Sequence, residues 1–144
     1  MNDKSIDAVH WSFWVIGAIA LIWNVMGAIN FIVQMDADVL AAMPASHRAI
    51  VEGRPIWATL GFALGVFGAT LGCLLLLLRK SAAYYLFIAS FLGMIVQLIH
   101  TLNIARSPID FSLFDVLMIM LMPVVVSVLL IWYSKWAESR NWTG

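Results

Sequence analysis

Residues 55–78 read PIWATLGFALGVFGATLGCLLLLL and are followed by Arg79 and Lys80. A helix needs about 20 apolar residues to cross roughly 30 Å of hydrocarbon, and this stretch meets that length without a charged side chain. Lipid offers no hydrogen-bond partners to the backbone, so a segment of this kind is expected to be helical. The stretch therefore predicts a transmembrane helix that ends at a basic loop.

Four glycines recur within this stretch at a spacing of three or four residues: Gly61, Gly65, Gly68 and Gly72. That spacing places them on one face of a helix, where the absence of side chains lets another backbone approach closely. We predict that this glycine face is a helix-packing surface. Packing inside the bundle and association with another chain are both open at this stage.

Three further stretches are long and apolar enough to span a membrane, namely residues 11–33, 82–102 and 116–133. The 144 residues are 63% hydrophobic and 11% charged, whereas soluble domains have about 45–50% and about 25%. The first stretch lacks a small-x-small cleavage signal, which favours a retained helix over a signal peptide. We predict a single transmembrane domain over residues 1–144, all-α, built as an integral membrane four-helix bundle.

The connection between the first two spans, residues 35–54, is too long for a plain turn. Asp36 or Asp38 can cap a short helix, and Pro44 suits the first turn of another. We therefore predict a short helical outer loop, with a solvated connector as the alternative. In the fourth span, Pro123 lacks a backbone donor and predicts a kink.

Basic residues predict the orientation of the spans. With four spans, the N-terminus, the second-to-third loop and the C-terminal tail share one side. That side carries Lys4, Arg79, Lys80, Lys135 and Arg140, against Asp3, Asp7 and Glu138. The opposite side carries Arg48, Arg54 and Arg106, against Asp36, Asp38, Glu52, Asp110 and Asp115. The excess of basic residues on the first side predicts that both termini are cytoplasmic.

Polar side chains inside a membrane are costly unless they have partners, so each one is a candidate functional residue. Asn24 lies near the middle of the first span, one residue after Trp23, and Gln97 and His100 share a face of the third. If the two helices are neighbours, these four residues form a candidate polar pocket. Hydrogen bonding between helices and a proton-responsive role for His100 are the alternatives.

Other function classes find little support in the residues. Zero net charge gives no electrostatic case for nucleic acid. Cys73 is the only cysteine, so a two-cysteine redox relay is excluded, and the three histidines cannot converge with it on a metal. No nucleophile is paired with a base. We therefore predict neither an enzyme nor a bound metal or cofactor.

Several short motifs resemble one known family. They are Trp23-Asn24 followed by Gly27, the Pro44 loop, Pro55-x-Trp57, the glycine run ending in Leu-Leu-Arg79-Lys80, and Ile131-Trp132-Tyr133-x-Lys135. Together they are similar to a group of small, uncharacterised four-span bacterial membrane proteins that are often labelled "sugar transporter". The resemblance covers nearly the whole chain and implies a location in the bacterial inner membrane.

Three functional hypotheses follow, of which a membrane enzyme that acts on lipid or quinone is the last, because no nucleophile is paired with a base. The first is a non-enzymatic accessory or structural subunit that binds another membrane protein through the glycine face. The second is a facilitator of a small neutral solute such as a sugar, bound by Trp23, Asn24, Gln97 and His100. One four-helix chain is too thin to enclose a path, so the second hypothesis requires a homo-oligomer. Apart from the lipid bilayer, the expected partners are a second copy or a membrane protein.

Overall fold

The computed structural model describes residues 9–106 and 111–144, and these contain helices and no strand. The elements are α1 (Trp11–Val33), α2 (Ala37–Ala42), α3 (Ala45–Glu52), α4 (Ile56–Leu77), α5 (Ala83–Ala105), α6 (Leu113–Asp115), the π-helical η1 (Val116–Leu121) and α7 (Met122–Ser139). Four helical segments, with α6, η1 and α7 counted as one, are long and apolar enough to cross a membrane. The predicted all-α membrane bundle is confirmed.

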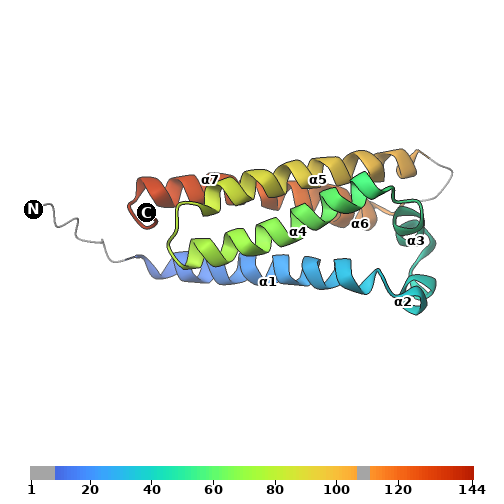
Figure 1. The fold of residues 1–144 in the computed structure, drawn as a ribbon, viewed down its shortest axis with the longest axis horizontal. Coiled ribbons are helices and arrows are strands. Elements are labelled where there is room, and N and C mark those ends of the chain that lie inside the picture. The colour runs from blue at the N-terminus through green and yellow to red at the C-terminus, as the bar shows by residue number, and fades with distance from the viewer. Residues whose placement is uncertain (1–8, 107–110) are drawn as a thin grey trace, which may run out of the picture.

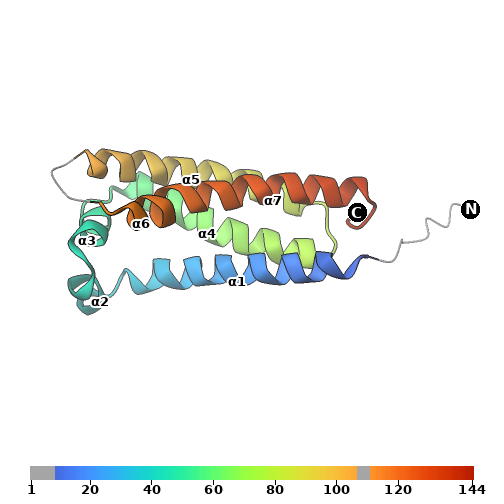
Figure 2. The same cartoon turned by 180° about the vertical axis from the view of Figure 1, so that it is seen from behind.

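The four long helices run side by side, with α4 packed against both α1 and α5, and α7 packed against α5 (Figure 1). The two ends of the described chain lie together at one end of the bundle, here called the terminal end. Helices α2 and α3 cover the opposite end, here called the α3 end, as Figure 2 also shows from behind. Among the described residues α1 does not pack closely along α7.

The glycine face of α4 packs against α5. A Cβ atom added at Gly61, Gly65 or Gly72 would lie 2.7 Å from Val96, Met94 or Phe87, respectively. The Ser90 hydroxyl of α5 donates to the Gly65 carbonyl at 2.6 Å. The glycine face is therefore covered by α5. It serves packing inside the bundle, which is the first of its two predicted uses.

Large side chains fill the terminal end. Phe13, Leu76 and Phe87 are fully buried there, and Phe13 stacks on Tyr133 with ring centroids 6.4 Å apart. The C-terminal tail folds back over this cluster, so that Trp142 meets Phe13 edge to face. Arg79, in a left-handed backbone conformation at the end of α4, donates from Nε to the Trp142 carbonyl at 2.7 Å and so holds the tail.

The connection between α1 and α4 is helical, as predicted. One carboxylate oxygen of Asp36 accepts from the backbone amides of Asp38 and Val39 and caps α2. Pro44 immediately precedes α3, which ends before Gly53. The sequence therefore builds two short helices across this end of the bundle.

The fourth span is longer than the predicted residues 116–133. It begins after Ser112, whose side chain forms a reciprocal capping box with Asp115, and continues to Ser139. Residues 116–121 are π-helical, and the Met122 amide donates to Leu117, five residues back. The hydrogen-bond register thus shifts just before Pro123, the residue whose missing donor predicted a kink.

The other predicted spans, residues 11–33, 55–78 and 82–102, correspond to α1, α4 and α5, and α5 runs three residues further. Four of the charged residues used to predict the orientation lie outside the described residues, namely Asp3, Lys4, Asp7 and Asp110.

We predict that Gly93→Ala destabilises the bundle by about 1–3 kcal/mol, because overpacking a tight contact forces the backbone to shift. A Cβ there would lie 2.5 Å from the Gly61 carbonyl oxygen and 2.8 Å from the Gly65 amide nitrogen. Gly68→Ala is the control, since its Cβ would meet Ser90 at an ordinary 3.6 Å. Thermal unfolding in detergent measures both, and equal midpoints for the two variants would contradict the tight crossing.

Candidate functional site

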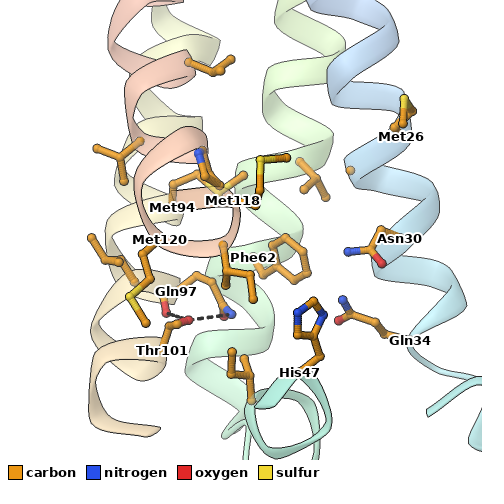
Figure 3. Close-up of a pocket in the computed structure, with 18 of the residues that line it drawn as sticks. Met26, Asn30, Gln34, His47, Phe62, Met94, Gln97, Thr101, Met118 and Met120 are labelled. Atoms are coloured by element: carbon orange, nitrogen blue, oxygen red, sulfur yellow. Dashed lines mark hydrogen bonds between the residues drawn. The ribbon is translucent and has the colours of Figure 1, made fainter. Parts of the chain in front are cut away.

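A cavity of about 410 Å³ lies between α1, α4, α5 and the η1–α7 helix, beneath α3. Its walls combine methionine and phenylalanine side chains with neutral polar groups. Figure 3 shows Asn30, Gln34 and His47 on one side of the cavity, opposite Gln97 and Thr101 of α5. The methionines Met26, Met94, Met118 and Met120 surround the same space. Cavities of this size and mixed lining are typical of small-molecule sites.

The structure places three of the four predicted pocket residues around this cavity. Trp23, Asn24 and Gln97 line it. His100 does not belong to the lining: it is 4% exposed, and its Nε2 lies 2.9 Å from the Ile50 carbonyl of α3. Its ring also meets Trp57 edge to face, with centroids 6.2 Å apart. His100 therefore ties α3 to α5 and positions the cover of the cavity.

Asn24 is largely satisfied by the protein itself. Its amide nitrogen donates to the Ala20 carbonyl at 2.8 Å and lies 3.6 Å from the Cys73 sulfur of α4. The side chain is buried, so these contacts compensate its transfer from water. Its geometry matches the alternative of hydrogen bonding between helices, with the cavity on one side.

Gln97 is satisfied only in part. Its amide nitrogen makes a long 3.5 Å contact to the Thr101 hydroxyl, which itself donates to the Gln97 backbone carbonyl. Its side-chain oxygen Oε1 is buried and has no hydrogen-bond partner within the described part of the chain. Leaving such an acceptor unpaired costs about 1–3 kcal/mol. A donor group on a bound molecule would remove that cost.

Arg54 is a lining residue that the sequence analysis counted only as a loop charge. Its Nη2 donates to the Gln34 side-chain oxygen, and its guanidinium carbon lies 5.0 Å above the Phe62 ring. Its Nη1 is buried and has no partner within the residues described. Burial lowers the pKa of Arg54 from its ordinary value, because the charged form loses water. The sequence showed an arginine directly before a transmembrane helix. It did not show the neighbours of that arginine, which come from distant segments.

A second contact that the sequence did not predict fastens α3 to the start of the fourth span. The His47 Nε2 lies 2.9 Å from a carboxylate oxygen of Asp115, and the Ser46 hydroxyl donates to the other oxygen at 3.4 Å. His47 lines the cavity, whereas Asp115 does not. Together with His100, these contacts hold α3 across the cavity from two sides.

The groups around the cavity can bind a molecule. The lining offers amides, hydroxyls, one imidazole and one guanidinium among apolar walls. Within residues 9–106 and 111–144, no cluster of three or more His, Cys, Asp or Glu side chains has the geometry to hold a metal ion. The groups present can orient a molecule that carries both hydrogen-bonding and apolar parts.

We predict that His100→Ala loosens α3 without unfolding the bundle. The Ile50 carbonyl loses its imidazole partner, and a buried group left unpaired in this way costs about 1–3 kcal/mol. Amide hydrogen exchange by mass spectrometry should rise in residues 45–52 and stay unchanged in α1. His10→Ala is the control, because His10 is exposed and its ring contacts Trp11 and Ser12 at the start of α1. Unchanged protection of α3 in the His100 variant would refute this positioning role.

Comparison with known proteins adds no relative: no protein-family model matches the chain, and neither the curated proteins nor the solved structures give a significant match. The resemblance to the small four-span bacterial family therefore stays a prediction from the quoted motifs. What stands is a multi-pass membrane protein with a cavity at its α3 end.

Proposed function

We propose that this chain is a non-enzymatic membrane protein that binds a small molecule in the cavity at its α3 end. The observation that carries the proposal is the Gln97 side-chain oxygen, a buried acceptor without a partner among the described residues, on the wall of a cavity of about 410 Å³. Buried polar groups in folded proteins are nearly always paired, so an exception beside a cavity points to a ligand.

Burial of the glycine face counts against the accessory role and so favours ligand binding. That role was expected to use Gly61, Gly65, Gly68 and Gly72 as a contact surface for another protein. In the bundle these residues are buried, and α5 occupies their face. A partner protein would have to bind elsewhere, on helix surfaces that carry the ordinary apolar side chains of a lipid-facing wall.

Binding in the cavity does not by itself account for transport of the bound molecule. The cavity occupies the α3 end, and buried aromatic and aliphatic side chains fill the terminal end. A path across the membrane therefore requires rearrangement of that packing or a homo-oligomer that encloses the path between copies. We keep facilitation of a small solute as the second proposed function, because the cavity would supply its binding site.

We place the protein in the bacterial inner membrane with both termini cytoplasmic and the α3 end facing outward. The orientation is supported by four basic residues: Arg79 and Lys80 in the α4–α5 loop, and Lys135 and Arg140 at the C-terminal end of α7. Both segments lie at the terminal end of the bundle (Figure 1). Arg79 and Lys80 form part of a tight loop, where the effect of basic residues on orientation is strongest. The cavity is then reached from the outer side.

We predict that Gln97→Leu abolishes retention of the bound molecule while raising the stability of the empty protein by about 1 kcal/mol, because it removes an unpaired buried acceptor. Native mass spectrometry of protein extracted in mild detergent and in nanodiscs measures retention, and thermal unfolding measures stability. Thr70→Val is the control, since that hydroxyl donates to the Val66 carbonyl and lies outside the lining. Equal retention by both variants, or no retained mass in the wild type, would count against ligand binding here.

The orientation makes a separate prediction. A reporter enzyme that is active only outside the cytoplasm should be inactive when fused after Gly144 and active when inserted after Gly53. Gly53 follows α3 and is exposed, so an insertion there disturbs little packing. The reverse pattern of activity would overturn the cytoplasmic placement of the termini and leave the cavity itself untouched.

A further inference from the structure

The cavity contains a charge that its protein neighbours do not neutralise. The polar contact of Arg54 is to the neutral Gln34 amide, and its other partner is the Phe62 ring. Among residues 9–106 and 111–144, no carboxylate lies within ion-pair distance of its guanidinium. Asp36, Asp38 and Glu52 on the connecting segment are exposed, and none lines the cavity. A partly buried cation in this position is stabilised when a counter-ion joins it.

The free group on Arg54 has the geometry to bind an anion. Its Nη1 is buried and has no partner in the described residues, whereas Nη2 is held by Gln34 and so fixes the plane of the guanidinium. The planar fork of arginine suits phosphate and carboxylate oxygens. Arg48, on α3, also has a buried Nε without a partner among these residues. The Asp115 carboxylate at this end is already bonded to His47.

The rim of the cavity is apolar at the depth of the membrane. Met26 of α1 and Met118 of η1 both line the cavity, and they are 62% and 39% exposed. They belong to two helices that do not pack closely along each other among the described residues, so the gap between them is bounded by side chains and not by backbone. Unbranched methionine side chains adapt readily to a flexible apolar chain. A molecule dissolved in the bilayer can therefore reach the cavity from the side.

The lining is charged and polar at the α3 end and becomes more apolar deeper in the span. Arg54 precedes α4 at the α3 end, Asn30 and Gln34 lie on and just after α1 there, and Val66 and Met94 line the cavity deeper in the span. The still deeper amide of Asn24 is bonded to the Ala20 carbonyl. A lipid in one leaflet has the same order, with its charged head at the interface and its chain in the hydrocarbon. The mixed lining, which a wholly polar solute would fill poorly, suits such a molecule.

Building on the proposed function, we propose that the cavity binds an amphiphile with an anionic head group, a phosphate or a carboxylate, and an acyl chain. The Arg54 guanidinium binds the head group, Gln97 accepts a hydrogen bond from its polar portion, and the chain leaves between Met26 and Met118. The molecule enters sideways from the leaflet on the α3 side. Binding is reversible and involves no covalent step.

The test uses the full chain, delipidated in detergent, and compares dioleoyl phosphatidylglycerol, oleate, the neutral lipid dioleoylglycerol and glycerol 3-phosphate. Native mass spectrometry titrations give the apparent affinities. We expect at least one of the two anionic amphiphiles to bind about tenfold tighter than dioleoylglycerol, which has no anionic group and so lacks the charge-assisted contact to Arg54. Which of the two binds tighter identifies a phosphate or a carboxylate head group. Glycerol 3-phosphate, which has no chain, should bind weakest.

Substitutions then locate the preference. Arg54→Gln should abolish it, and Arg54→Lys, which keeps the charge without the fork, should leave part of it. Arg140→Gln is the matched control, because it removes one positive charge at the terminal end, where that guanidinium lies 5.1 Å from the Trp136 ring. Far-UV circular dichroism of every variant shows whether the helices persist.

The outcomes separate this inference from the proposed function. Equal affinity for the anionic amphiphiles and the neutral dioleoylglycerol, or a preference that survives in Arg54→Gln, overturns anion recognition. In that case, loss of lipid in Gln97→Leu would still support the cavity as a binding site. Glycerol 3-phosphate binding as tightly as the lipids overturns the role of the chain. Failure of the wild type to bind any amphiphile or to retain any small molecule removes both proposals.

Discussion

The contact on which the rest of the bundle depends is the crossing of α4 and α5, where backbone meets backbone. Gly93 of α5 lies against the Gly61 carbonyl and the Gly65 amide, and the Ser90 hydroxyl donates to the Gly65 carbonyl at 2.6 Å. Lipid gives helices no hydrophobic reason to associate, so close packing and hydrogen bonds of this kind must hold them. With α4 and α5 fixed, α1 packs on the other side of α4 and α7 packs on α5. The space between α1 and the fourth span follows from that order.

The space between α1 and the fourth span is filled differently at the two ends of the bundle. At the terminal end, Phe13 and Tyr133 reach across from α1 and α7 to stack, and Trp142 of the folded tail covers them. At the α3 end the lining mixes methionines, amides, Trp23, Phe62 and Arg54 around a cavity. The same helices thus form a dense half and a hollow half, and the difference lies in side-chain size and polarity along α1 and the fourth span.

Much of the fold could be predicted because its determinants are local. Apolar runs, glycine spacing and the caps at Asp36 and Pro44 each act within one segment, and the helices follow them. The cavity was predicted only in part. Trp23, Asn24 and Gln97 do line it, but His100 bonds to the Ile50 carbonyl, an acceptor fifty positions away that no spacing in the sequence reveals. Arg54 was missed for the same reason, since its surroundings come from α1 and α4 together. The π-helical turn was also not predicted, because a proline shows where a donor is missing and not how the register adjusts.

Three departures from regular packing border the cavity, and they support the proposal that it is a functional site. The unpaired acceptor on Gln97, the incompletely paired guanidinium of Arg54 and the π-helical turn at Met118 all border the same space. Each costs stability, and single apolar substitutions would remove the first two. Natural sequences usually agree across local and tertiary levels, and they depart from that agreement where function requires it. Buried hydroxyls that are unpaired among the described residues also occur at the terminal end, on Tyr133 and Thr143, so it is the combination of these three features around one cavity that supports the proposed binding of a molecule there.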